Sequence, residues 1–119
     1  MENKEKKLTA FTKFVVKELG IKNPPTIAIL GKRDGLKTTA SYDYSKENKV
    51  VKVYGGNNRL LVDVMRSIAH ELTHHQQWEN GKLKVRPPDI GGPIEDEANA
   101  KAGQFIKMFA KKDSTIYDD

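Results

Sequence analysis

Apolar residues recur at intervals of three and four near the start of the chain, and this spacing is typical of an amphipathic helix. The predicted helix spans residues 3–19, with apolar positions Leu8, Phe11, Phe14, Val15 and Leu19. Gly20 follows directly, where a glycine commonly ends a helix. We therefore expect an N-terminal helix with one buried face.

Three short runs rich in β-branched and apolar residues follow, and residues that favour turns separate them. These runs are residues 26–30, 36–44 and 50–54. In the third run Val51 and Val53 are two positions apart, so they share one face of the strand. The pattern predicts a small three-stranded sheet.

Helical spacing returns in residues 59–79 and again from residue 93 to about residue 112. The apolar stripe of the first of these helices is Leu61, Val64, Met65, Ile68 and Leu72. The stripe of the second is Ile94, Ala98, Ala102, Phe105, Ile106 and Phe109. Asn58 and Gly81 are suitable caps for the first helix, and Pro93 suits the first position of the second. The polar tail, residues 113–119, is expected to fray.

This order of elements predicts one α+β domain over residues 1–119, with an N-terminal helix, a three-stranded sheet, a central helix and a closing helix. The small residues Ala98, Ala102 and Gly103 should let the closing helix lie close to the central one. Hydrophobic residues make up 37% and charged residues 31%, a balance typical of globular proteins. No apolar run is long enough for a membrane span, and the charged start lacks the apolar segment of a secretory signal. We expect a cytoplasmic protein without membrane contact.

The composition also restricts the chemistry. The chain has no cysteine, so disulfides, zinc–thiolate sites and cysteine nucleophiles are excluded, and a metal site must use His, Asp or Glu. The formal net charge is +5, with basic residues scattered along the chain. Such a surface could attract nucleic acid, but no recognition motif accompanies it. Oligomeric state is not predicted by the sequence.

The segment His70-Glu71-Leu72-Thr73-His74 is an H-E-x-x-H motif inside a predicted helix. Residues four apart lie on the same side of a helix, so His70 and His74 can bind one metal ion. They project opposite the apolar stripe, and Glu71 lies where it can take a proton from a bound water. His75 projects near the stripe, so we interpret it as a packed residue and not as a ligand.

A catalytic zinc site needs a third protein ligand besides an open position for water. All three histidines of the chain lie in this one helix, so the third ligand should be a carboxylate. Glu95 lies on the flank of the closing helix's stripe, whereas Asp96 and Glu97 project away from it. Glu95 is therefore the predicted ligand. Asn99, one turn further on, could hydrogen-bond a ligating imidazole.

Together, His70-Glu71-x-x-His74 and Glu95-x-x-Ala98-Asn99 resemble the gluzincin pattern of H-E-x-x-H followed by E-x-x-A-(D/N). Compact metallopeptidases of the ImmA/IrrE type are the most similar in appearance. The resemblance covers residues 68–110 and implies a zincin-like fold and a Zn²⁺ peptidase in which Glu95 is the third ligand. The chain departs from these proteins in length, since it has no room for a second lobe.

The predicted function is hydrolysis of a peptide bond in a protein or peptide by zinc-activated water. The alternative is a non-catalytic zinc-stabilised binding or regulatory module, with or without nucleic acid, which would not require Glu71. Residues 38–42 could be an edge strand that aligns substrate or an ordinary hairpin strand. Four tyrosines are candidates for a further oxyanion donor, and the sequence does not choose among Tyr42, Tyr44, Tyr54 and Tyr117.

Overall fold

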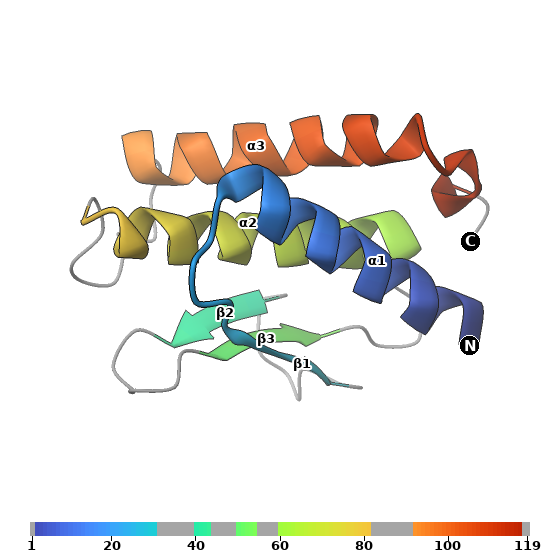
Figure 1. The fold of residues 1–119 in the computed structure, drawn as a ribbon, viewed down its shortest axis with the longest axis horizontal. Helices are drawn as coiled ribbons and strands as arrows, with labels where there is room; N and C mark the ends of the chain where they lie inside the picture. Colours follow the sequence, from blue (N-terminus) through green and yellow to red (C-terminus); the bar gives the residue numbers. More distant parts are fainter. Residues whose placement is uncertain (1, 31–39, 44–49, 55–59, 82–91, 118–119) are drawn as a thin grey trace.

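Three long helices and a small sheet make up the described part of the chain, which is mostly helical (Figure 1). The computed structural model describes residues 2–30, 40–43, 50–54, 60–81 and 92–117. The elements, in chain order, are α1 (Glu2–Leu19), β1 (Thr26–Leu30), β2 (Ala40–Asp43), β3 (Val50–Tyr54), α2 (Leu61–Glu79), α3 (Pro93–Ala110) and the short 3₁₀ helix η1 (Ser114–Tyr117). No helix in these residues combines the length and apolar character that a membrane span requires.

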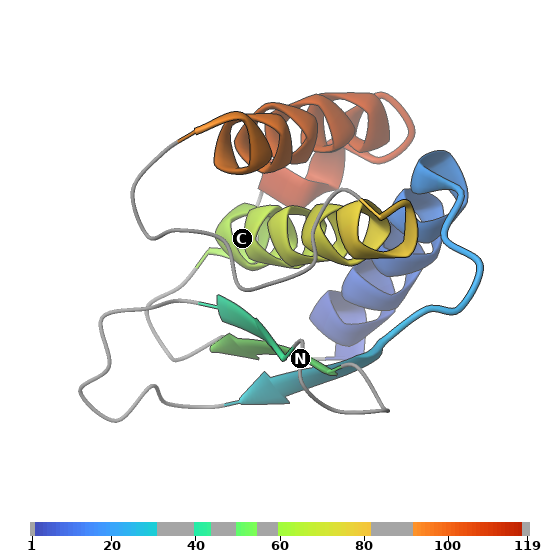
Figure 2. The same cartoon turned by 90° about the vertical axis from the view of Figure 1, so that its left-hand side faces the viewer.

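Helix α2 is the central element of the fold. It contacts α1, α3, β2 and β3, and Figures 1 and 2 show it between α3 and the sheet. Its predicted apolar stripe is buried throughout, with exposed fractions from 0 to 5%. Polar residues on its other faces are buried as well, among them His74, His75 and Gln77. A helix enclosed in this way can hold polar side chains in fixed positions away from water.

The sheet has the strand order β1-β3-β2, so β3 is central. Strand β3 is parallel to β1 and antiparallel to β2. Val51 and Val53 are both fully buried, which confirms that they share the inner face. Strands β1 and β3 have the predicted bounds. Strand β2 covers residues 40–43 of the predicted run 36–44, and the rest of that run lies outside the described residues.

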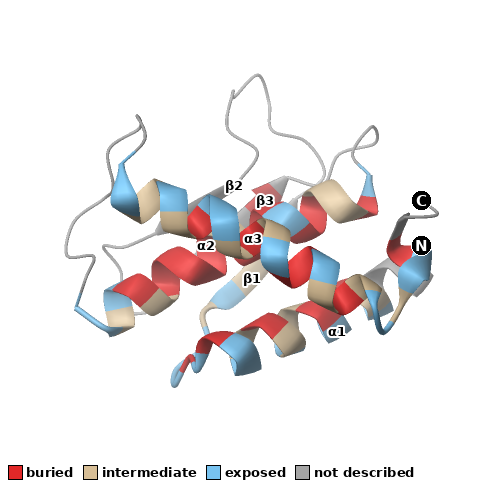
Figure 3. Ribbon diagram, turned by 90° about the horizontal axis from the view of Figure 1, so that it is seen from above, coloured by how far each residue is buried: buried red, intermediate tan, exposed pale blue. Residues whose placement is uncertain are grey.

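The core forms where the buried faces of α1, α2 and α3 meet (Figure 3). Phe11 of α1 and Phe109 of α3 pack edge to face, with ring centroids 5.4 Å apart. Ala98 and Ala102 of α3 are fully buried, as expected for residues that allow close helix packing. Gly103 does not have this role, because a Cβ added there would meet no atom within 4 Å.

The helix ends agree with the sequence in part. Gly20 and Gly81 have φ values of 68° and 77°, the left-handed conformation that glycine adopts most easily after a helix. The prediction of Asn58 as N-cap was wrong: α2 begins at Leu61, its N-cap is Leu60, and no side chain caps it. Asn58 itself lies outside the described residues.

The expectation of a frayed tail was also wrong for residues 114–117. They form η1, and Ile116 is fully buried in the core. The backbone N–H of Thr115 donates to Asp113 Oδ1 at 3.0 Å, and Lys7 Nζ of α1 donates to Thr115 Oγ1 at 2.7 Å. The buried isoleucine and these polar contacts hold the tail against α1, α2 and α3.

Candidate metal centre

Helix α2 presents two imidazoles one turn apart. His70 and His74 are separated by four residues, so both rings project from the same side of the helix. Their Nε2 atoms are 3.1 Å apart. Two nitrogen donors therefore converge on one point next to α2.

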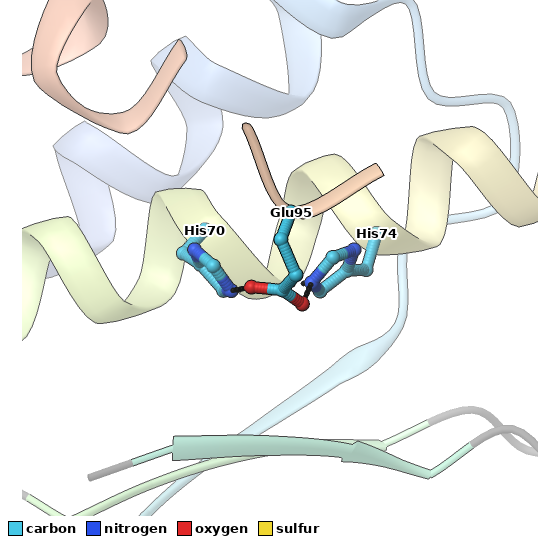
Figure 4. Close-up of side chains that lie close together, drawn as sticks. All are labelled: His70, His74 and Glu95. Atoms are coloured by element: carbon cyan, nitrogen blue, oxygen red, sulfur yellow. Dashed lines mark hydrogen bonds and ion pairs between the residues drawn. The ribbon is translucent and has the colours of Figure 1, made fainter. Parts of the chain in front are cut away.

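Glu95 in the first turn of α3 supplies a carboxylate at the same point. Its Oε1 is 2.9 Å from His74 Nε2, and its Oε2 is 3.2 Å from His70 Nε2. Figure 4 shows the three side chains pointing toward one another from the two helices. Pro93 occupies the start of α3, and the buried Ala98 lies one turn after Glu95, so the carboxylate is held close to α2.

The three donor atoms fit a metal ion. Donors that lie about 2.0–2.1 Å from a tetrahedral zinc ion are roughly 3.3–3.4 Å from one another. The distances between the Nε2 atoms of the two histidines and from each Nε2, of His74 and then of His70, to the Glu95 carboxylate are 3.1, 2.9 and 3.2 Å, slightly shorter than that spacing. A tetrahedral ion held by these three donors would keep a fourth coordination position for a water or a substrate atom.

The site is buried on one side and open on the other. The His74 side chain is 2% exposed, whereas those of His70 and Glu95 are 20% and 21% exposed. Burial lowers the pKa of His70 below its usual value, and the neighbouring His74 lowers it further, while Glu95 and a side-chain hydrogen bond with Asn99 raise it. A lowered pKa favours the neutral imidazole, which is the form that binds a metal.

Glu71 and Asn99 both lie next to the three donors. Glu71 is 7% exposed, and its Oε2 is 4.0 Å from His70 Nε2. The carboxylate is thus adjacent to the site without being one of the three converging groups. A side-chain hydrogen bond with Asn99 contributes to the pKa of His70, which agrees with the expectation that Asn99 could bond a ligating imidazole.

Gln77 and Glu97 also belong to the site, and sequence reasoning missed them. Gln77 is fully buried, and its Oε1 lies 2.8 Å from His74 Nδ1. Its Nε2 donates to Glu97 Oε1 at 2.8 Å. Helical projection placed Glu97 away from the apolar stripe of α3 and gave no sign of this contact, which forms because Gln77 reaches from α2 to the start of α3. The spacing of three between His74 and Gln77 was the available signal.

His75 is packed, as predicted, and takes no part in the group of donors. It is 1% exposed, and its Nε2 lies 2.7 Å from the backbone oxygen of Asn23. Glu79 Oε2 is 3.4 Å from the same nitrogen and also accepts a hydrogen bond from the backbone N–H of Asn23. His75 and Glu79 thus tie the end of α2 to the segment between α1 and β1.

Comparison with protein-family models, curated proteins and solved structures finds no match to this chain. Among the described residues, His70, His74 and Glu95 form the group that could hold a metal ion. With Glu71 beside it, this group has the components needed to polarise a carbonyl and to activate a water.

Proposed function

We propose that the protein is a zinc-dependent hydrolase, a metallopeptidase of the gluzincin type that cleaves peptide bonds in a protein or peptide substrate. The observation that carries this proposal is the convergence of His70 Nε2, His74 Nε2 and the Glu95 carboxylate, with the buried Glu71 carboxylate beside them. A helix that needed only to pack would not collect four ionisable groups at one point, since burying them costs free energy.

Each residue has a distinct task in this proposal. His70, His74 and Glu95 would hold the ion. A bound zinc supplies a Lewis acid and lowers the pKa of water toward about 7. Glu71 would accept a proton from the attacking water as its oxygen bonds to the scissile carbonyl carbon, and would then deliver that proton to the leaving amine nitrogen as the C–N bond breaks.

The sheet offers a means of aligning an extended substrate. Among the described strands β2 lies at an edge of the sheet, where it pairs with β3, and α2 contacts it. The free side of an edge strand carries backbone donors and acceptors that can pair with an extended peptide. This position supports the edge-strand interpretation of residues 38–42, of which residues 40–42 are described. The side chains of the four candidate tyrosines lie outside the described ones, so the oxyanion donor stays unassigned.

The donor set favours zinc among the common metals. Two imidazoles and a carboxylate suit zinc, but the same set also binds iron(II) in oxygenases. Glu71 distinguishes the two, because a general base next to the open position serves hydrolysis. Metal analysis of the purified protein tests this choice directly, with about one zinc per chain expected and iron at that level contradicting the proposal.

Cleavage of a peptide library tests the activity. Glu71→Gln keeps the size of the side chain and removes the base, so it should bind zinc normally and lose activity by about 10²-fold or more. His74→Ala should lose both zinc and cleavage. Equal cleavage by the wild type and Glu71→Gln would reject Glu71 as the base. A fully zinc-loaded wild type that cleaves nothing would favour the non-catalytic zinc-stabilised module.

A further inference from the structure

Gln77 makes three polar contacts although it is fully buried. Its Oε1 lies 2.8 Å from His74 Nδ1, and its Nε2 donates to Glu97 Oε1 at 2.8 Å and to the backbone oxygen of Ile94 at 3.1 Å. The contacts reach from α2 to two residues near the start of α3, Ile94 and Glu97. Gln77 therefore joins the helix that carries the histidines to the helix that carries Glu95.

The partners of Gln77 determine which way its amide points. The backbone oxygen of Ile94 can only accept a hydrogen bond, and an ionised Glu97 carboxylate can only accept as well. The NH₂ group of Gln77 must face these two oxygens, so its carbonyl oxygen must face His74. An amide that could otherwise be placed in either orientation has one orientation here.

The orientation of the amide in turn determines the tautomer of His74. Because Gln77 Oε1 is an acceptor, His74 Nδ1 must carry the hydrogen in the bond between them. In the neutral ring Nε2 then carries the lone pair, and this atom faces the Glu95 carboxylate at 2.9 Å. Two acceptors so close to each other require a proton or a cation between them.

We propose that Gln77, held by Glu97 and Ile94, is a positioning residue that fixes His74 as the Nδ1–H tautomer and aims its Nε2 at the metal position. The role of Gln77 in metal binding rests on the proposed function, whereas the tautomer of His74 does not depend on a metal. Glu97 completes the arrangement, since its Oε2 lies 3.9 Å from Lys101 Nζ. Ligating histidines depend on such partners, and loss of one typically lowers metal affinity about 10- to 100-fold.

Four variants test this proposal. Gln77→Met preserves the length of the side chain but removes both hydrogen-bonding groups, and Glu97→Ala removes the carboxylate that holds the amide. Glu97→Gln keeps an oxygen acceptor and should restore the arrangement. Gln76→Met is the matched control, because the Oε1 of Gln76 has no hydrogen-bond partner among the described residues.

Two measurements are made on each variant. Competition with a fluorescent chelator gives the zinc affinity, and ¹⁵N spectra of histidine-labelled, metal-free protein give the tautomer of His74. Gln77→Met should lower zinc affinity about 10- to 100-fold and should reduce the Nδ1–H form of His74. Glu97→Ala should change both readouts in the same direction, whereas Glu97→Gln and Gln76→Met should stay close to the wild type.

Each result separates this inference from the proposed function. A wild type whose metal-free His74 carries its hydrogen on Nε2 would overturn the inference, whatever metal the protein binds. An Nδ1–H tautomer in a protein that binds no zinc would support the inference and reject the metallopeptidase. If Gln77→Met does not fold, Glu97→Ala tests the proposal in its place. A folded Glu97→Ala with the zinc affinity and the His74 tautomer of the wild type would overturn the positioning role of Gln77 and Glu97.

Discussion

Three consecutive acidic residues near the start of α3 have three different environments. Glu95 contacts both His70 and His74, Glu97 accepts a hydrogen bond from Gln77, and Asp96 is exposed. The three carboxylates therefore differ in role: Glu95 is a candidate ligand, Glu97 supports a ligand, and Asp96 interacts favourably with the helix dipole. Helical projection separated Glu95 from its neighbours but treated Asp96 and Glu97 alike.

Replacement of these acids should show the difference in metal binding. Glu95→Ala removes one of three donors. Loss of a residue that only supports a ligand lowers metal affinity about 10- to 100-fold, and the loss of zinc affinity in Glu95→Ala should be larger than that. Asp96→Ala is the matched control and should bind zinc as the wild type does. Chelator competition measures both. Retention of wild-type affinity by Glu95→Ala would place the third ligand elsewhere.

The lowered pKa of His70 leads to a pH dependence of stability in the metal-free protein. Burial, and after it the neighbouring His74, lowers the pKa of His70 and favours its neutral form in the folded state, whereas the unfolded chain takes up a proton near pH 6.5. The unfolded state then binds more protons, so stability is full above pH 6.5 and is lost as pH falls through the folded pKa of His70.

Denaturant unfolding in the presence of a chelator measures this effect. The free energy of unfolding of the wild type should fall as pH drops below about 6.5, and His70→Gln should fall less over the same range because it has no imidazole to protonate. Equal pH dependence of the two proteins would show that His70 does not carry the effect.

At the scale of elements, the site depends on the spacing between α2 and α3. The donors come from both helices, and Ala98, which lies one turn after Glu95 on α3, is fully buried. A larger side chain at this position would force the helices apart, and overpacking of a core usually costs about 1–3 kcal/mol. The separation of Glu95 from the two histidines would increase at the same time.

Ala98→Leu should therefore lower both the free energy of unfolding and the zinc affinity. Ala100→Leu is the matched control, because Ala100 lies on the exposed side of the same helix turn. Thermal unfolding and chelator competition test the two variants together. Wild-type zinc affinity in a destabilised Ala98→Leu would mean that the site tolerates movement of α3.

Periodicity predicts each helix and its buried face, but it does not predict which neighbour approaches each polar residue. His70, His74 and Glu95 could be predicted to share one site, because metal binding requires a third donor and the chain offers few His, Asp and Glu residues in suitable positions. The contact between Gln77 and Glu97 has no such requirement behind it, and it depends on the distance and rotation of α3 relative to α2. These are properties of packing and are not contained in the periodicity of either helix.

At the scale of the whole molecule, the tail was the part least accessible to sequence reasoning. Ile116 stands among polar residues, so it produces neither a helical nor a strand period. Its burial becomes visible only when η1 is seen against α2 and α3. Most of the remaining core positions repeat along α1, α2 and α3 or alternate along β3, and their spacing made them recognisable in advance.

Ile116→Ala should separate the stability of the core from the chemistry of the site. Truncation of a fully buried isoleucine typically costs about 2–5 kcal/mol. Helix α3 has 18 residues and a length of about 27 Å, with Glu95 in its first turn and η1 beyond its last. The folded variant should therefore bind zinc with wild-type affinity although its midpoint of denaturant unfolding is lower.

Ser114→Ala, an exposed position in η1, is the control and should leave both quantities unchanged. Wild-type stability of Ile116→Ala would show that the tail does not contribute to the core, and a large loss of zinc affinity would show that the two ends of α3 are coupled.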